Sequence, residues 1–183
     1  MSSAFSITVD SSAWDRQLDA IGQGVVEAAR PAAQAGAQVL YDAYVSNLAR
    51  IRRVTGNLRR AAYQAYMDGD TAGGRASYRV SWNTTKAPHG HLIEYGFLQR
   101  YEMARDSRGR IFPMVRPEMR GKPKPKRRAS QAVKDAYYVP RKGGPLQIAA
   151  KSPLRRAASQ VPRARQAMLD RFYATLRAKG HIR

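Results

Sequence analysis

The residues of this chain best suited to chemistry lie together in the segment APHGHLIEYG, residues 87–96. The segment holds His89, His91 and Glu94, and so two of the three histidines of the sequence. On a helix, His91 and Glu94 would share a face, because residues three positions apart do so, and this spacing occurs in metal sites. The first question is therefore whether the segment is a metal centre or an acid–base site.

The rest of the sequence supports neither kind of site. It has no HExxH-like set, no Ser/His/Asp order and no second carboxylate beside Glu94. The absence of cysteine excludes disulfides, zinc–thiolate sites and thiol nucleophiles, and it is compatible with a reducing compartment. We therefore expect no catalytic residue, no metal and no cofactor, and a nuclease or other hydrolase is disfavoured.

A structural role for the segment is the favoured interpretation. Glu94 is expected to pair with a nearby arginine or with an adjoining subunit. Gly90 and Gly96 are expected to shape the ends of a short helical turn. Three side chains of that turn are expected to pack under a sheet: Leu92, Ile93 and Tyr95.

A long N-terminal helix is predicted ahead of this segment. Apolar residues recur at steps of three and four from Trp14 to Ile51, which is typical of one amphipathic helix or of two in line. Pro31 lies inside this run and is expected to kink or restart it. Ser12 and Asp15 resemble a capping box at its start, and residues 5–10 (FSITVD) alternate like a short strand.

Two strands are predicted after the helix. VTGNL (54–58) indicates a turn, and LRRAAYQAYM (58–67) and RASYRVSWN (75–83) are strand-like, with alternating aromatic residues. DGDTAGG (68–74) between them is typical of a hairpin loop, because several glycines can take positive φ. A phosphate-binding loop is the alternative, and it is disfavoured because the lysine and the spacing GxxxxGK[ST] are missing.

A second helix is predicted near the C-terminus. Ser152 and Pro153 are typical of the N-cap and first helical position, and Gly180 is typical of the residue after a helix. Pro162 can divide this helix into a short and a longer one. Its outward face is rich in arginine: Arg155, Arg156, Arg163, Arg165, Arg171 and Arg177.

These elements predict an α+β fold in which the long N-terminal helix and the C-terminal helix pack on a small antiparallel sheet. Residues 1–96 would form the body, residues 97–150 an extended, basic, proline-rich arm with a hairpin at most, and residues 151–183 a helix that completes the body. No apolar stretch is long enough to span a membrane, and the N-terminus lacks the pattern of a signal peptide.

Charge is the strongest signal in the composition. The chain has 33 basic and 13 acidic residues, but residues 1–99 carry 10 basic and 8 acidic residues, whereas residues 100–183 carry 23 and 5. A half this cationic is expected to face a polyanion, with nucleic acid as the first candidate and an acidic protein surface as the second. The residues expected to contact it are Lys122, Lys124, Lys126, Arg127, Arg128, Arg141, Lys142, Arg155, Arg156 and Arg163.

The sequence contains no base-reading module, so any contact with DNA is expected to involve phosphates and to depend steeply on salt. Tyr101, Tyr137 and Tyr138 could stack on bases or anchor a protein partner. One functional hypothesis is therefore a nucleic-acid-binding protein without sequence preference that uses its basic C-terminal half.

Three short motifs add a second hypothesis. TGNLRRA (55–61) follows the long helix, APHGHLIEYG follows the two strands, and KSPLRRAASQ (151–160) opens the C-terminal helix. In this order they resemble the head–tail joining family of long-tailed bacteriophages, also called neck or tail-completion proteins. The residues that match the family's motifs are Thr55, Gly56, Leu58 and Arg59, then Ile93, Glu94, Tyr95 and Gly96, then Pro153, Leu154, Arg155 and Ala157.

The chain departs from the family pattern in three places. Phe97 stands where the family usually has threonine, the third motif lacks its aromatic residue and second proline, and the segment 97–150 is longer than the family suggests.

The resemblance implies a non-enzymatic virion protein at the junction between capsid connector and tail tube, present in the host cytoplasm during assembly. It implies a homo-oligomeric ring with the connector, tail terminator and tube proteins as partners. Genome DNA passes through that junction and tube surfaces are often acidic, so the basic half would face one or both. Residues 100–150 are expected to become ordered only on assembly.

Overall fold

The computed structural model describes residues 12–51, 56–70, 74–107 and 109–182, and of residues 12–17 and 70 only the backbone. The predicted strand 5–10 and Thr55 lie outside the described residues, as do the side chains of Ser12, Trp14 and Asp15. The α+β class is confirmed. The helices are α1 (Ser12–Ala49), α2 (Asn57–Ala61), α3 (Gly90–Tyr95), α4 (Gln131–Tyr137), α5 (Pro153–Ala157) and α6 (Val161–Ala178), and the strands are β1 (Ala62–Tyr66), β2 (Tyr78–Trp82), β3 (Phe97–Gln99), β4 (Met103–Arg105), β5 (Ile111–Pro113) and β6 (Leu146–Ile148).

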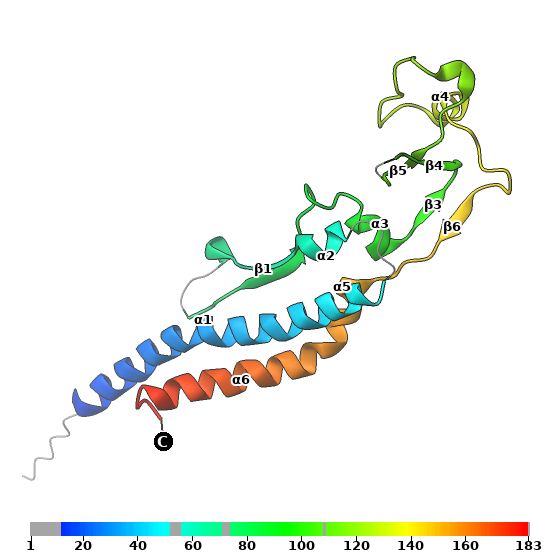
Figure 1. Ribbon diagram of the computed structural model, residues 1–183. Coiled ribbons are helices and arrows are strands. Elements are labelled where there is room, and N and C mark those ends of the chain that lie inside the picture. Colours follow the sequence, from blue (N-terminus) through cyan, green and yellow to red (C-terminus); the bar gives the residue numbers. More distant parts are fainter. Residues whose placement is uncertain (1–11, 52–55, 71–73, 108, 183) are drawn as a thin grey trace, which may run out of the picture. The chain divides into compact units, whose positions relative to one another are not determined.

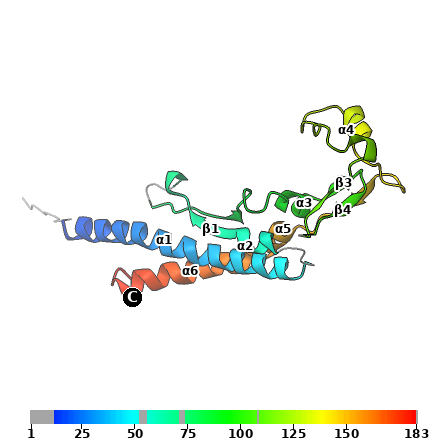
Figure 2. The ribbon, with the colours of Figure 1, turned by 45° about the horizontal axis from the view of Figure 1, so that its top comes forward.

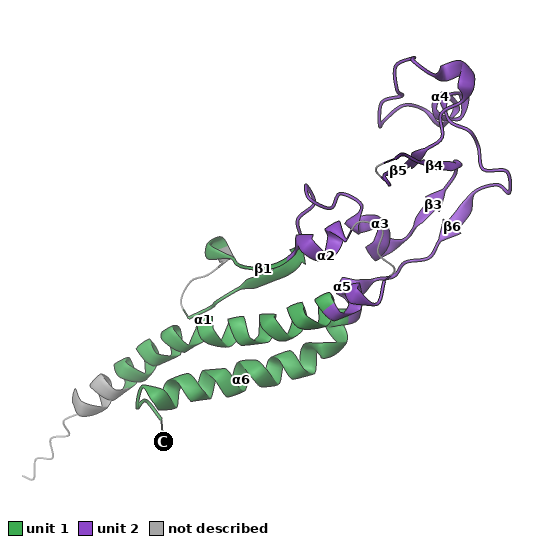
Figure 3. Cartoon of the chain, viewed as in Figure 1, with its two compact units in different colours: residues 1–45, 63–81, 157–183 green, residues 46–62, 82–156 purple. Residues whose placement is uncertain are grey.

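The chain forms two compact units, which Figure 3 distinguishes by colour. Unit 1 comprises residues 1–45, 63–81 and 157–183, and unit 2 comprises residues 46–62 and 82–156. Unit 1 has 10 basic and 8 acidic residues, whereas unit 2 has 23 and 5. The excess positive charge is therefore a property of unit 2, and α6 belongs to the nearly balanced unit.

In unit 1, α1 and α6 lie side by side and antiparallel (Figures 1 and 2). Small residues allow this approach: a Cβ atom on Gly36 would lie 2.4 Å from Met168 Cγ and 3.1 Å from the Ala164 carbonyl oxygen. Near the other end of the pair, Lys179 forms an ion pair with Glu27. The buried residues of this face of α1 follow helical spacing: Ala28, Ala32, Ala33 and Ala37.

Helix α1 continues through Pro31 as one helix, so the restart expected at this proline does not occur. Proline removes one main-chain hydrogen bond, but the alanine-rich face on both sides of it is buried against neighbouring elements. Burial of a long amphipathic face supplies most helical stability in proteins, and here it maintains the helix across the interruption.

The predicted hairpin after α1 is confirmed, with β1 and β2 paired in one sheet. Met67 N donates to Ser77 O at 3.0 Å and Asn83 N donates to Ala61 O at 2.8 Å, which makes the pairing antiparallel. The strand is shorter than predicted, because residues 57–61 form α2 instead. The left-handed Gly56, with φ 74°, turns the chain into this short helix.

Within unit 2, residues 97–150 contain more structure than the hairpin that the sequence suggests. Strand β3 pairs with β6 in an antiparallel register that places Phe97 opposite Ile148, and β4 pairs with β5. Helix α4 is capped by the Ser130 hydroxyl, which accepts a hydrogen bond from Val133 N. The expectation of a hairpin at most is wrong, because the β3–β6 pairing joins segments too far apart in sequence for local periodicity to reveal.

The division of the C-terminal helix near Pro162 is confirmed. Helix α5 ends at Ala157, a short 3₁₀ turn covers residues 158–160, and α6 follows. Gly180 follows the end of α6 and lies in the left-handed region at φ 74°. Its N–H donates to Arg177 O and the His181 N–H donates to Leu176 O, which is the Schellman arrangement.

We predict that Gly36→Val weakens the pairing of α1 with α6. The added methyl groups would meet Met168 and the Ala164 carbonyl, and overpacking of this kind lowers the free energy of unfolding by about 1–3 kcal/mol. Gly22→Val is the matched control, because Gly22 has no heavy atom near its Cβ position. Urea denaturation should show no loss for the control, since valine favours helix over glycine. Equal losses in both variants would contradict this packing.

Candidate functional site

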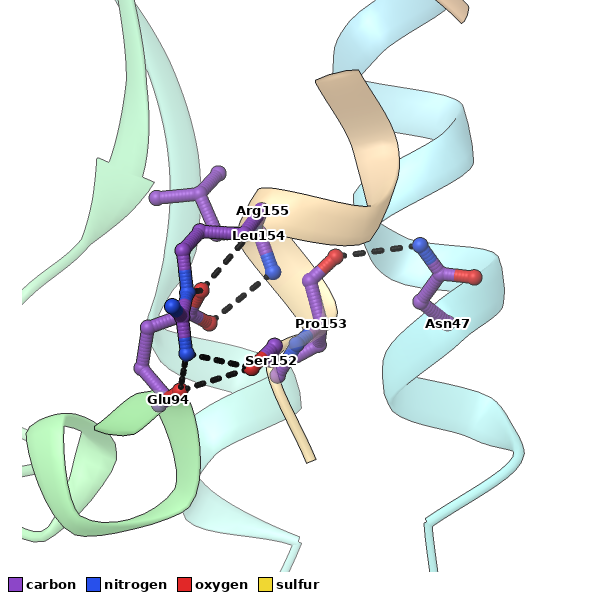
Figure 4. Close-up of polar contacts among 6 residues, drawn as sticks. All are labelled: Asn47, Glu94, Ser152, Pro153, Leu154 and Arg155. Carbon is purple, nitrogen blue, oxygen red and sulfur yellow. Dashed lines mark hydrogen bonds and ion pairs between the residues drawn. The ribbon is translucent and has the colours of Figure 1, made fainter. Parts of the chain in front are cut away.

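The buried carboxylate of Glu94 is the centre of the candidate site. Its side chain is only 2% exposed, and it projects from α3 toward the start of α5 (Figure 4). Leu154 N donates to Oε2 at 3.0 Å and Arg155 N donates to Oε1 at 2.9 Å. These N–H groups lie in the first turn of α5, where a helix has no main-chain acceptors of its own. Glu94 therefore caps a helix that lies sixty residues further along the chain.

The Arg155 side chain surrounds the same residue. Its Nε atom lies 3.4 Å from Glu94 Oε1, and Nη2 donates to the Glu94 carbonyl oxygen at 2.8 Å. Ser152 Oγ donates to that same carbonyl at 2.9 Å and accepts from Arg155 Nη2 at 2.6 Å. The polar groups of Glu94 thus have partners, as a buried charge requires. The expected pairing of Glu94 with a nearby arginine is confirmed.

The main chain locks the same two segments together. Ile93 O accepts from Lys151 N at 2.9 Å and from Ser152 N at 3.3 Å. Gly96 has φ 74°, and a Cβ atom there would lie 2.5 Å from Ile148 O, so only glycine fits. Ser152 also takes a positive φ, of 48°, which is uncommon for a residue other than glycine.

The prediction that Ser152 immediately precedes the helix is confirmed, but the side chain that caps the helix is that of Glu94 and not that of Ser152. The Ser152 carbonyl accepts the first helical bond, from Arg156 N at 2.9 Å, yet its hydroxyl bonds Glu94 O instead of the free N–H groups. Asn47, at the end of α1, also belongs to the site, because its Nδ2 donates to Pro153 O at 3.0 Å. No sequence signal linked Asn47 to a residue 106 positions away.

Tyr95 corrects another expectation, because its side chain is 66% exposed and does not pack under a sheet. Glu94 occupies the inward face of α3, and the next residue of a helix points about 100° away. The Tyr95 ring instead faces the Arg155 guanidinium, whose carbon lies 5.1 Å from the ring centre. Leu92 and Ile93 are half-buried.

The first family motif lies in the same unit. Leu58 and Ala61 of α2 are buried, with 7% and 3% exposure, and Arg59 is exposed. Asn83 N, just after β2, bonds Ala61 O. Direct hydrogen bonds therefore join the second and third motifs. The first motif is bonded to Asn83, the residue that follows the β1–β2 hairpin.

The site is arranged for structural support. Both carboxylate oxygens of Glu94 accept hydrogen bonds from main-chain N–H groups, and these bonds cap α5. Within the described part of the chain, no set of three or more His, Asp or Glu side chains is placed to hold a metal ion. A membrane-spanning candidate is likewise not found among the described helices.

The basic residues predicted from the sequence to bind a polyanion are not all in one part of the structure. The five of the loop between residues 120 and 130 are exposed, and the described residues provide no ion-pair partner for them: Lys122, Lys124, Lys126, Arg127 and Arg128. Lys142, Arg155 and Arg156 are also exposed in unit 2, and Arg141 is half-buried. Arg163 is exposed on α6 and so belongs to unit 1.

Contacts with α4 hold this basic loop in unit 2. Tyr137 OH donates to Lys122 O at 3.1 Å, and Lys134 Nζ donates to Arg127 O at 2.9 Å. The loop backbone therefore has hydrogen-bond partners on α4, while its five cationic side chains are exposed.

The three tyrosines that could have stacked on bases pack on one another. The centre of the Tyr138 ring lies 5.0 Å from the ring centres of both Tyr101 and Tyr137, and Tyr138 is buried. Tyr101 OH donates to Asp135 at 2.8 Å; this bond, followed by the one from Gln131, lowers the pKa of the Asp135 carboxyl. Burial and then the Asp135 contact raise the pKa of Tyr101, and burial raises the pKa of Tyr138.

Comparison with known proteins agrees with the motifs. Residues 12–96 match the family model described as Bacteriophage HK97-gp10, putative tail-component. No curated protein and no solved structure matched the chain. The match includes the first two motifs and confirms the resemblance to phage head–tail joining proteins over that range. It supports a structural role in a phage tail or neck, and a structural family favours a function other than catalysis.

We predict that Glu94→Gln lowers the free energy of unfolding of the protein by about 2–3 kcal/mol. The amide removes the charge and turns an NH₂ group toward main-chain donors, so at least one bond to a buried charge is lost. Chemical denaturation monitored by circular dichroism measures the loss. Glu118→Gln is the control, because among the described residues Glu118 makes only an exposed pair with Arg116 at 3.8 Å. This substitution should change stability by less than about 0.5 kcal/mol. A Glu94 variant as stable as this control would contradict the capping role.

Proposed function

We propose that this protein is a virion structural component at the head–tail junction of a long-tailed phage, where it completes the tail so that it can attach to the capsid connector. The match of residues 12–96 to a phage tail-component family is the observation that carries this proposal. The partners would be the connector, the tail terminator and the tube protein, and the protein would act as a subunit of a ring.

The Glu94 cluster supports a role in assembly. It connects α3, the end of α1 and the start of α5 through main-chain and side-chain bonds, all within unit 2. Preorganised segments lose less conformational entropy on association, which favours binding to other subunits. The third family motif lies beyond the matched residues, and this cluster bonds it to the second motif.

The charge of unit 2 supports an anionic environment in the particle. Copies of a unit with 23 basic and 5 acidic residues would repel one another in a ring unless anionic groups lay nearby. Genome DNA in the junction and acidic protein surfaces are the two sources we consider. DNA contact, where it occurs, would be through phosphates and without sequence preference.

A nucleic-acid-binding protein unrelated to the phage tail is the second candidate. The observation that favours it is the exposed basic loop, whose lysine and arginine side chains have no acidic partner in the described residues.

Deletion of the gene from its phage tests the first candidate. We predict DNA-filled heads and separate tails in electron micrographs, because the joining subunit is missing, and a fall in infectious titre of several orders of magnitude. Supplying the wild-type protein to the extract should restore joining. Attached, infectious particles from the deletion phage would contradict the proposal.

A binding titration separates the two candidates. We predict negligible binding of the purified protein to free duplex DNA near physiological salt, together with tight binding to isolated tails. A nucleic-acid-binding protein would instead bind the duplex tightly. If it used the five loop cations, its affinity would fall about 500-fold between about 50 mM and 200 mM salt. Replacing Lys122, Lys124 and Lys126 by glutamine would then reduce that salt dependence.

A further inference from the structure

The β4–β5 hairpin of unit 2 carries a group of exposed apolar side chains. We define the hairpin surface by Met103, Ile111, Phe112 and Met114, which are 40%, 48%, 42% and 39% exposed. All four lie within twelve residues of sequence, on the two paired strands or immediately after them. Single exposed apolar residues are ordinary on protein surfaces, but a cluster marks an interaction site.

The register of the hairpin places these side chains on both of its faces. Met103 lies opposite Pro113 and Arg105 lies opposite Ile111, so this group shares one face. Phe112 lies opposite Ala104 on the other face. A two-stranded hairpin gains little stability in water by itself, and apolar groups on both faces cannot be covered by one flat surface. A groove that receives the hairpin covers both.

The charges around the hairpin surface define the border of that groove. Three acidic residues near the hairpin are half-buried and accept hydrogen bonds: Asp106 pairs with Arg110 at 2.6 Å, Glu102 accepts from Lys142 N at 3.0 Å and Asp135 accepts from Tyr101. Arg105 is exposed on the hairpin and has no carboxylate partner in the described residues. The exposed charge beside the apolar cluster is therefore positive, and carboxylates complement it.

The chemistry of the surface favours a protein over a nucleic acid. Methionine, aromatic residues and arginine are enriched at protein interfaces, whereas only Phe112 of the four side chains offers a stacking face for a base. The neighbouring rings of Tyr101 and Tyr138 already pack together. Charge also argues against a second copy of this chain, because neither unit has an excess of acidic residues.

We propose that the hairpin surface inserts into an apolar groove, bordered by carboxylates, on a protein of different sequence. This inference deepens the proposed function and rests on it for the source of the partner, which is another component of the same particle. The hairpin supplies the apolar contact, and the cations of unit 2 supply the electrostatic complement that fixes orientation and speeds association.

Photocrosslinking in assembled particles tests the partner. The photoreactive residue p-benzoylphenylalanine replaces Phe112 in one variant and Tyr173 of α6, which is 48% exposed, in a control variant. We expect a crosslink from position 112 to a different virion protein, at a segment that mass spectrometry shows to contain apolar and acidic residues, and no such crosslink from position 173. A crosslink from position 112 to DNA, to a second copy of this chain, or to nothing in particles that contain the protein would overturn the inference.

The double variant Ile111→Ser/Phe112→Ser measures the contribution of the apolar contact. Its affinity for isolated tails should fall at least about 20-fold, as expected for the loss of central interface side chains. Val133→Ser on α4 is the control, because Val133 is 52% exposed in the same unit and should leave binding within about twofold. Circular dichroism confirms that both variants fold, and equal binding by both overturns the inference.

The outcomes separate this inference from the proposed function. If the protein is absent from purified particles and its deletion leaves heads and tails joined, the proposed function fails. If the protein is present and needed for joining, but the hairpin variant binds tails as the wild type does, only the hairpin inference fails.

Discussion

The buried carboxylate of Glu94 is the interaction on which unit 2 depends. An isolated buried charge would cost several kcal/mol, and the structure avoids this cost by supplying two main-chain N–H donors and a guanidinium from residues 154 and 155. In return, the carboxylate fixes the start of α5, to which Asn47 at the end of α1 is also bonded. Glycine at position 96 follows from the same constraint, because the chain leaves α3 against the Ile148 carbonyl.

Charge and packing are distributed differently between the two units. Unit 1 is held by the close approach of α1 and α6 at small residues and is nearly balanced in charge. Unit 2 has short strands, many exposed cations and an apolar hairpin, and its excess of basic residues makes it repel itself. A partner that supplies both carboxylates and an apolar surface would offset the positive charge and cover the exposed apolar side chains. Phosphate would offset only the charge.

Local patterns in the sequence predicted the features that depend on local physics. The long helix, the β1–β2 hairpin, the division near Pro162 and the Gly180 stop follow from periodicity and from glycine and proline. The pairing of β3 with β6 and the contact of Asn47 could not be predicted, because both join distant segments. At the site, the sequence predicted a glutamate–arginine pair. It could not predict that Glu94 caps a helix, because this depends on the position of α5, or that Tyr95 is exposed, because this depends on the orientation of α3.

The sixty-residue separation between Glu94 and its donors also bears on the order in which the chain can fold during synthesis. Until residues 152–155 have left the ribosome, the nascent segment around α3 lacks the donors for the Glu94 carboxylate. It also lacks Ser152 and Arg155, which donate hydrogen bonds to the Glu94 carbonyl oxygen. That segment must stay solvated while the intervening β3–β6 stretch is made, so the contact between α3 and α5 forms late. A premature stop before the third motif would therefore release a chain with an open α3 region, a natural target for cellular proteases.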